Sequence, residues 1–189
     1  MARPQRADAR RNYARVVAAA HEVFAEAGPE ASLNEIARRA DVGPGTLYRH
    51  FPTRGALLTA VLRDRIEALC GRADELLASE SPDVALTEWL HAFLAHARSG
   101  QGLGGALMTS EPDDLGFDCH QRIRDAAAGL LENAQRAGTA RADLGPGDLL
   151  QLVVGVALAT VRTADPEEPA RLLGLILDAI PAPPGTASS

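Results

Sequence analysis

The sequence contains no lysine, only two cysteines and few aromatic residues, and it lacks a long uncharged apolar run. Cys70 and Cys119 stand apart without CxxC spacing, so they cannot staple a chain of 189 residues, and we expect buried free thiols. No run of about 18 apolar residues could span a bilayer. The N-terminus is basic, but a charged amphipathic segment follows it instead of an apolar signal core. We therefore predict a cytoplasmic protein without a membrane partner.

Charge is distributed unevenly along the chain. Residues 1–54 hold nine arginines against six acidic residues, a net charge of +3, whereas residues 55–189 hold ten arginines against nineteen acids, a net charge of −9. The overall net charge of −6 argues against a general polyanion binder. A basic N-terminal region on an acidic remainder is the asymmetry expected when only the first part meets a nucleic acid.

Apolar residues recur at helical spacing almost throughout, and the alternation typical of strands is absent. The sequence therefore predicts an all-α fold of about nine helices. The expected helices cover residues 10–27, 32–39, 44–50, 53–78, 82–98, 114–137, 146–162 and 166–180, with one loose turn after a flexible break at 100–105 and a disordered tail at 181–189. Ser32 and Glu35 have the spacing of a capping box at the start of the second helix.

The tripeptide Gly43-Pro44-Gly45 could be part of a phosphate-binding loop or the start of a helix. The chain has no GxxxxGK[ST] motif, no lysine to complete one and no strand ahead of Gly43, which argues against the loop. The same tripeptide recurs at residues 145–147, before another expected helix. Gly43 suits an N-cap, Pro44 suits the first helical turn, and Pro52 ends the segment. The pattern therefore indicates a helix start.

Two short helices joined by a tight turn and backed by an amphipathic first helix form a helix-turn-helix arrangement. The side chains expected to project from the second short helix are those of Thr46, Arg49 and His50. At its far end, the Tyr48 phenol can donate to oxygens of a nucleic-acid backbone. The alternative, in which the aromatic residues only pack a three-helix core, is favoured for Phe51, which we expect to plug the space against the next helix.

The run Ser32–Leu58, "SLNEIARRADVGPGTLYRHFPTRGALL", resembles the N-terminal DNA-binding domain of the tetracycline-repressor (TetR) family of bacterial regulators. The resemblance extends back to Tyr13. It includes "IARRADV" before the turn, "GTLYRHF" as the recognition helix, and Arg54 as a basic residue opening the next helix. It implies a dimer whose recognition helices enter successive major grooves, and it implies that Arg54 pairs with a DNA phosphate.

The motif and the resemblance together define an expected DNA-binding set. It comprises Ser32, Asn34, Gly43, Pro44, Gly45, Thr46, Tyr48, Arg49, His50 and Arg54, with Arg3, Arg6 and Arg10 in a mobile N-terminal arm that enters the minor groove. Ser32 and Asn34 would touch the backbone or a base edge. Because residues 43–45 offer no side chain for a bidentate base contact, sequence readout would depend on Arg49, the Thr46 methyl group and DNA shape.

The resemblance also implies the domain organisation. Residues 1–52 would form the helix-turn-helix domain with its basic arm, and residues 53–180 an effector-binding and dimerisation domain whose first helix, 53–78, is the connector. The last two helices are apolar around almost their whole circumference, which predicts a four-helix interface with a second chain or, alternatively, a large core within one chain. The expected interface comprises Leu149, Leu152, Val153, Gly155, Val156, Leu172, Leu175 and Ile176.

Candidates for catalysis are few. His91 and His96 are five residues apart, not the three or four that would align them on one helix face, so we expect no metal, no cofactor and no enzyme. Residues of the acidic domain could instead line a ligand pocket with apolar walls and a few polar groups. The expected pocket comprises Trp89, Phe93, His96, Met108, Phe117, His120, Ile123, Arg124 and Gln151.

The sequence thus predicts a homodimeric DNA-binding transcriptional regulator, a repressor released from a pseudo-palindromic double-stranded operator by a small-molecule effector of unknown identity. The alternative is a dimeric small-molecule-binding protein whose N-terminal helices mediate contacts with proteins instead of DNA.

Overall fold

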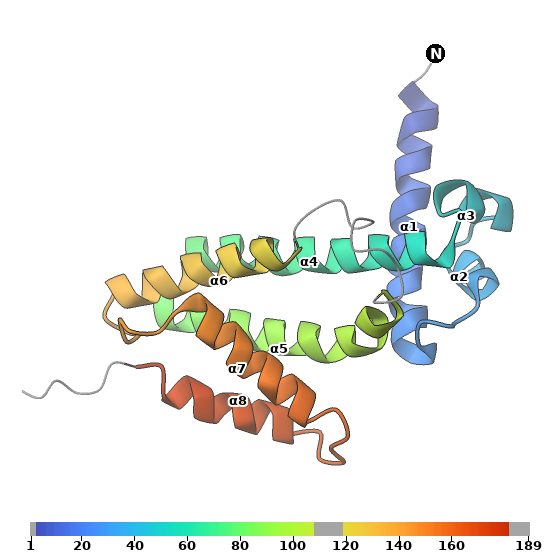
Figure 1. Ribbon diagram of the computed structural model, residues 1–189. Helices are drawn as coiled ribbons and strands as arrows, with labels where there is room; N and C mark the ends of the chain where they lie inside the picture. Colours follow the sequence, from blue (N-terminus) through green and yellow to red (C-terminus); the bar gives the residue numbers. More distant parts are fainter. Residues whose placement is uncertain (1–2, 108–118, 182–189) are drawn as a thin grey trace, which may run out of the picture. The chain divides into compact units, whose positions relative to one another are not determined.

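The computed structural model describes the backbone of residues 3–107 and 119–181, and the side chains of all of these except 3–7, 79 and 100–107 (Figure 1). Every regular element within these ranges is a helix, which confirms the all-α class. The eight helices are α1 (Arg3–Ala27), α2 (Leu33–Arg39), α3 (Pro44–His50), α4 (Arg54–Ser79), α5 (Pro82–Leu107), α6 (Cys119–Arg136), α7 (Pro146–Ala159) and α8 (Glu168–Asp178).

Two helices are longer than expected. α1 begins at Arg3, not near Arg10, so the residues assigned to a mobile arm continue the helix. Good helix formers in this segment and an ion pair between Asp8 and Arg11, three residues apart, account for the extension. α5 continues to Leu107, through the glycine-rich stretch expected to break it.

Packing divides the chain into two compact units, which we call the head and the body. The head contains residues up to Arg65 together with the end of α5, and the body contains Ile66–Arg98 and the chain from residue 119 onward. α4 and α5 each supply residues to both units, so the units are linked by continuous helices.

The head has its own apolar core, to which α1, α2, α3 and the first turns of α4 contribute. Leu47 is the buried residue of α3, only 1% exposed, and Phe51 follows it into the same core. The other buried members are Val16, Val17, Ala19, Ala20, Val23, Phe24, Ala31, Ile36, Ala37, Ala40, Leu57, Leu58 and Val61. Phe51 therefore packs between the helix-turn-helix and α4, as the sequence predicts.

The body contains a larger core built from α4 to α8. Trp89 of α5 is fully buried at its centre, and its indole N–H donates to the carbonyl of Leu69 at 3.0 Å. Its ring stacks on Phe93 with 5.5 Å between the ring centroids. Within the described residues, no helix is both long enough and apolar enough to cross a membrane.

Candidate nucleic-acid interface

The turn between α2 and α3 is a Schellman motif, the common way to end a helix with one left-handed residue. Asp41 takes that position with φ of 50°, its N–H donates to the carbonyl of Arg38 at 3.1 Å, and the Val42 N–H donates to that of Ala37 at 3.0 Å. Gly43 then caps α3 in an extended conformation. The bounds of α3, Pro44 to His50, match the sequence prediction.

An arginine of α1 holds this turn in place. The Arg15 guanidinium donates to the main-chain carbonyl of Asp41 and, at 2.8 Å, to the carboxylate of the same residue. Asp41 is thereby held from another helix in a backbone conformation that non-glycine residues seldom adopt. Because α3 begins two residues later, the contact fixes where the recognition helix starts relative to α1.

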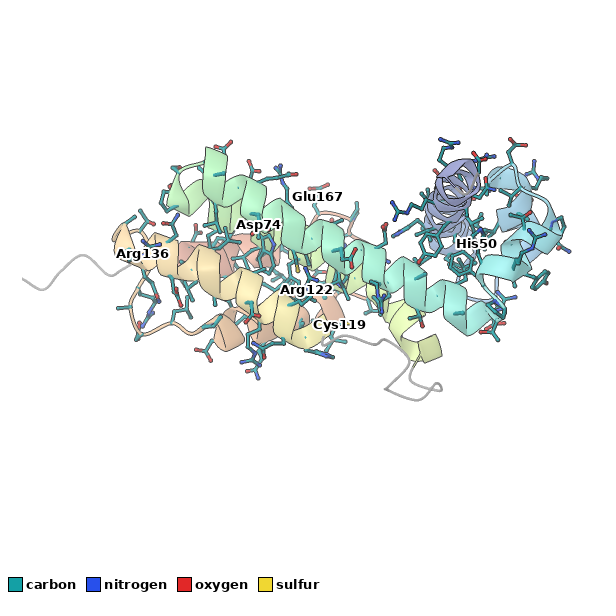
Figure 2. The ribbon with its side chains drawn as sticks, turned by 90° about the horizontal axis from the view of Figure 1, so that it is seen from above. His50, Asp74, Cys119, Arg122, Arg136 and Glu167 are labelled. Carbon is teal, nitrogen blue, oxygen red and sulfur yellow. The ribbon has the colours of Figure 1, made fainter. Side chains whose placement is uncertain are left out.

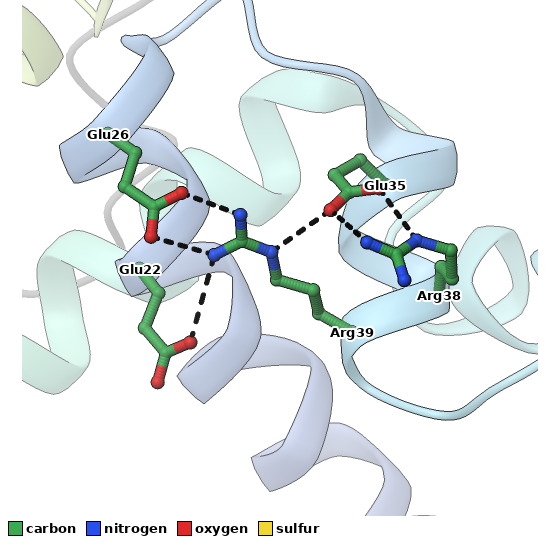
Figure 3. A network of polar contacts seen from close by, with 5 residues as sticks. All are labelled: Glu22, Glu26, Glu35, Arg38 and Arg39. Atoms are coloured by element: carbon green, nitrogen blue, oxygen red, sulfur yellow. Dashed lines mark hydrogen bonds and ion pairs between the residues drawn. The ribbon is translucent and has the colours of Figure 1, made fainter.

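A second set of ion pairs joins α1 to α2 (Figure 3). Arg39 donates to both carboxylate oxygens of Glu26, at 2.8 and 2.6 Å, and to Glu35 at 3.0 Å, while Glu22 lies 4.0 Å away. Arg38 donates to both oxygens of Glu35 at 2.8 and 2.7 Å. The hydrogen bonds from Arg38 and Arg39 lower the pKa of Glu35 to about 2.

The capping box expected at the start of α2 is absent. Ser32 occupies the N-cap but makes no side-chain capping hydrogen bond, and Glu35 points instead to the two arginines of its own helix. A bidentate, charge-assisted contact with arginine is stronger than a single hydrogen bond to a backbone amide, which explains why Glu35 contacts the arginines and not the Ser32 N–H. The Ser32 hydroxyl is therefore not committed to the cap.

Most residues expected to meet DNA are accessible. Ser32, Asn34, Arg49 and the three residues at the start of the recognition helix, 43–45, are exposed, and Tyr48 is 49% exposed. Thr46 and His50 are half-buried. Figure 2 shows His50 at the end of α3 near α1, and its ring lies edge-on to Tyr13 with 6.1 Å between the centroids.

Arg54 has an internal role that the sequence did not indicate. One of its terminal nitrogens donates to the carbonyls of Pro29, at 2.8 Å, and Ala31. It thus ties the loop between α1 and α2 to the start of α4. A phosphate contact by the same side chain stays a prediction.

The arginines of the head are largely used inside it. Arg11, Arg15, Arg38, Arg39 and Arg54 all have partners within the head. Among the described side chains of the head, Arg10 and Arg49 make no ion pair or hydrogen bond and are exposed. The side chains of Arg3 and Arg6 lie outside the described residues. Among the described side chains of the head, Arg49 on α3 and Arg10 on α1 are therefore the exposed arginines free to meet a phosphate.

Comparisons with known proteins cover both units. The family of bacterial regulatory proteins named tetR matches residues 16–61, and the C-terminal domain of SbtR-like transcriptional regulators matches residues 81–181. The chain belongs to the TetR family. It is accordingly a DNA-binding transcriptional regulator with a helix-turn-helix.

Two solved structures resemble the TetR-family chain along nearly its whole length. The TetR transcriptional regulator SCO0520 from Streptomyces coelicolor is 39% identical, with coverage of 88% of this chain and 97% of that one and a TM-score of 0.77. A TetR regulatory protein from Mycobacterium vanbaalenii is 36% identical, with coverage of 95% and 100% and a TM-score of 0.78. The transcriptional repressor Rv3405c of Mycobacterium tuberculosis is 36% identical over 100 residues, 52% of this chain and 48% of that protein.

The residues expected to line a ligand pocket fall into two groups in the TetR-family regulator. Trp89 and Phe93 are buried, Ile123 packs against the same core, and the His96 ring stacks on Phe93. His120, Arg124 and Gln151 are exposed, and Gln151 lies beside Leu152 in a surface hollow on α7. Met108 and Phe117 lie outside the described residues. Within the described part of the chain, no three His, Cys, Asp or Glu side chains gather to hold a metal ion.

The residues expected to form the dimer interface also fall into two groups, one buried within the chain and one exposed. Leu149, Val153 and Val156 are buried within the chain, which corrects their assignment to a surface between chains. Leu152, Gly155 and Leu175 are exposed, and Leu172 and Ile176 are half-buried. The apolar circumference of α7 thus serves two purposes, because one side packs on α6 and α8 and the other faces outward.

Proposed function

We propose that this TetR-family regulator represses transcription by placing α3 of each protomer of a homodimer in the major groove of a pseudo-palindromic, double-stranded operator. The observation that carries the proposal is the combination of an exposed, unpaired Arg49 on α3 with a turn held from α1 by Arg15. A recognition helix discriminates between sequences only if its side chains are held in a fixed position.

Each accessible residue, including the half-buried Thr46, then has a chemical role. Arg49 is the side chain able to donate two hydrogen bonds to a guanine edge, and the Thr46 methyl group can contact thymine. Tyr48, Ser32 and Asn34 supply neutral hydrogen bonds to the backbone. Because residues 43–45 bring only main chain close to the bases, DNA shape contributes much of the specificity.

The DNA-binding proposal is tested with two variants matched in charge. Arg49→Gln removes the unpaired arginine of α3, and Arg136→Gln removes an exposed arginine at the end of α6 in the body. The operator is first selected from fragmented genomic DNA with the wild-type protein. We expect Arg49→Gln to weaken operator binding at least tenfold and to relax the preference at one base pair, with Arg136→Gln within twofold of wild type. Equal affinities for both variants would contradict the proposal.

The homodimer forms, in this proposal, through the outward sides of α7 and α8. Five large apolar residues are exposed on α7, on α8 and just after the end of α7, which is unusual for a protein that stays monomeric. They are Leu152, Val154, Leu158, Val161 and Leu175, of which Leu158 and Leu175 are 60% and 61% exposed. The open space above Gly155 leaves room for a second helix to approach closely.

The dimer is tested at Gly155 because a side chain there meets nothing within 4 Å in the single chain. Gly155→Leu should therefore leave the protomer folded but hold the partner helices apart. We expect light scattering after size exclusion to give the mass of one chain for the variant and of two chains for wild type. Gly71→Leu, at an equally open glycine on α4, is the control and should remain dimeric.

Release from DNA would follow binding of a small-molecule effector in the body, which acts in the cytoplasm and without catalysis. α4 runs from Arg54 in the head to Ser79 in the body, so a tilt of this one helix changes the spacing of the two recognition helices. That spacing must match one DNA turn, about 34–36 Å. A coupling of about 1–3 kcal/mol changes affinity roughly 5- to 150-fold.

Trp89 provides the readout for this step because it is the single tryptophan of the chain and lies in the proposed pocket region with Phe93 and His96. Compounds that release labelled operator should also change the Trp89 fluorescence with the same midpoint. Release of DNA without any change at Trp89 would place effector binding elsewhere.

A further inference from the structure

A histidine lies where α1 meets the first part of α4 within the head (Figure 1). His21 of α1 places its Nε2 atom 3.3 Å from the Asp64 carboxylate of α4. Val17 and Phe24, one turn before and after His21 on α1, are buried, so the ring lies at the edge of the apolar core. The contact is a polar link between the helix that holds the recognition turn and the helix that leads into the body.

The arrangement around the His21 ring suits the neutral form of the imidazole. The Nε2 atom is buried and makes no hydrogen bond, although an Asp64 oxygen lies near it. A neutral imidazole has one nitrogen without a hydrogen, whereas an imidazolium carries an N–H on both nitrogens. A buried N–H without an acceptor is destabilising. Protonation of His21 therefore requires α1 and α4 to shift until Nε2 finds an acceptor, or the ring to leave the contact.

The surroundings of the ring also disfavour its charged form. Burial lowers the pKa of His21 from its ordinary value of 6.5, while the Asp64 carboxylate raises this pKa and Arg65 lowers it. The Asp64 side chain is 63% exposed and that of His21 only 28%, so water weakens the attraction that would hold a proton on the ring. Both charged groups belong to α4, and residues 100–107 at the end of α5, which are part of the head, include no titratable side chain.

We propose that His21 and Asp64 form a proton-dependent contact that holds α4 on the head at neutral pH and loosens under acidic conditions, with a loss of operator affinity. The inference rests on the proposed DNA-binding function, because it concerns how firmly the recognition helix is held. α1 holds the turn before α3 through Arg15, and α4 follows α3 after Phe51. A shift between α1 and α4 therefore moves α3 away from the position in which its side chains read the DNA.

The sign of the pH effect follows from the lowered pKa of His21. The unfolded chain binds this proton more tightly than the folded head does, so the unfolding free energy increases with pH in the range between the two pKa values. The contribution of neutral His21 is fully present above pH 6.5 and is lost as the pH falls from 6.5 through the lowered pKa of the folded head. Acidification just below pH 6.5 is the condition that loosens the contact.

The first test follows the titration of the His21 ring by NMR in the full-length protein, with His21→Gln to assign its signal among the five histidines. Asp64→Asn removes the carboxylate and should lower the pKa of His21 further, whereas Arg65→Gln removes the opposing cation and should raise it. A residue with only a packing role would not show shifts of opposite sign. A His21 pKa at or above 6.5 in wild type would overturn the proposal.

The second test measures affinity for the selected operator duplex at pH 7.5 and pH 5.5. The ratio of the two affinities should be about fivefold larger for wild type than for His21→Gln, the lower end of an ordinary coupling between sites. His91→Gln replaces an exposed histidine of α5 in the body and should keep the wild-type ratio within about twofold. Any effect of pH on His50 of α3 is common to wild type and both variants, so the comparison isolates His21.

The outcomes separate this inference from the proposed function. Equal ratios for wild type and His21→Gln, with Arg49→Gln still defective, would overturn the inference alone. If circular dichroism shows that His21→Gln does not fold, the onset of the acid-induced loss of affinity should move to lower pH in Asp64→Asn and to higher pH in Arg65→Gln, and an unchanged onset in both would overturn it. A wild-type protein that selects no duplex would overturn the proposed function, and the NMR titration would still decide whether the contact depends on the proton.

Discussion

The head and the body of this protein are both helical, but they leave opposite kinds of surface uncovered. In the head, Arg39 and Glu26 join α1 to α2, and exposed hydrogen-bond donors remain on α3 and α1. In the body, a set of large apolar side chains on and next to α7 and α8 is exposed. A donor-rich surface fits a polyanion, and an apolar one fits another protein surface.

The two units also differ in how their geometry is held. The head is small, with a core to which α3 contributes the single buried residue Leu47, so cross-helix ion pairs and a specific turn add to the packing. The body has a larger apolar core that includes the fully buried Trp89, and an ion pair between Arg72 and Glu88 joins α4 to α5. A unit that must present side chains in one exact register benefits from directional contacts, because apolar packing alone tolerates rearrangement.

The largest effect is expected in the body, from Trp89→Ala. The change removes a fully buried ring and its stacking on Phe93, which costs about 3–5 kcal/mol of unfolding free energy. Urea unfolding followed by circular dichroism measures it. The control, Trp89→Phe, fills most of the space and should lower the unfolding free energy much less. A loss of unfolding free energy below about 1 kcal/mol for Trp89→Ala would mean that the body core can collapse around the cavity.

A smaller effect is expected in the turn of the head, from Asp41→Ala compared with Asp41→Gly. Both variants lose the carboxylate that Arg15 contacts, but only alanine must adopt the left-handed φ of 50° with a side chain that favours other conformations. We expect Asp41→Ala to be less stable than Asp41→Gly by about 1 kcal/mol in urea unfolding. Equal stabilities would show that the Arg15 contact, and not the backbone, determines the turn.

The smallest effect should come from the ion pairs between α1 and α2, and it depends on pH. The pKa of Glu35 is lowered from 4.5 to about 2, so its ion pairs stabilise the folded head fully above pH 4.5 and cease to do so as the pH falls through 2. The urea midpoint of wild type should therefore exceed that of Glu35→Gln at pH 6, and the difference should shrink toward pH 2. A difference that does not vary with pH would contradict a role for the charged carboxylate.

Local signals along the chain were sufficient to predict the helix-turn-helix. Gly43, Pro44 and Pro52 determine where α3 starts and ends through their own backbone preferences, and the bounds are confirmed. The all-α class could also be predicted from residue spacing, and the TetR family from the resemblance of the run Ser32–Leu58. The length of α1 was underestimated since its first turns have no apolar stripe and are mostly arginine, alanine and other polar residues.

The partners of charged residues could not be predicted in the same way. Arg15 meets Asp41 across 26 residues, and Arg54 meets carbonyls of the loop after α1, so these contacts exist only when the helices are packed. The two sides of α7 pose the same problem. Leu149 and Leu152 are alike in sequence, but one is buried and the other is 48% exposed.

The sequence by itself determined the helical class and the recognition helix of this regulator, because both depend on spacing and backbone preference within a few turns, and its resemblance to known regulators indicated the family. Only the tertiary structure decided which arginines remain free, which side of α7 is uncovered, and that His21 of α1 meets Asp64 of α4. Those properties depend on which distant side chains reach one another, and local preferences do not contain that information.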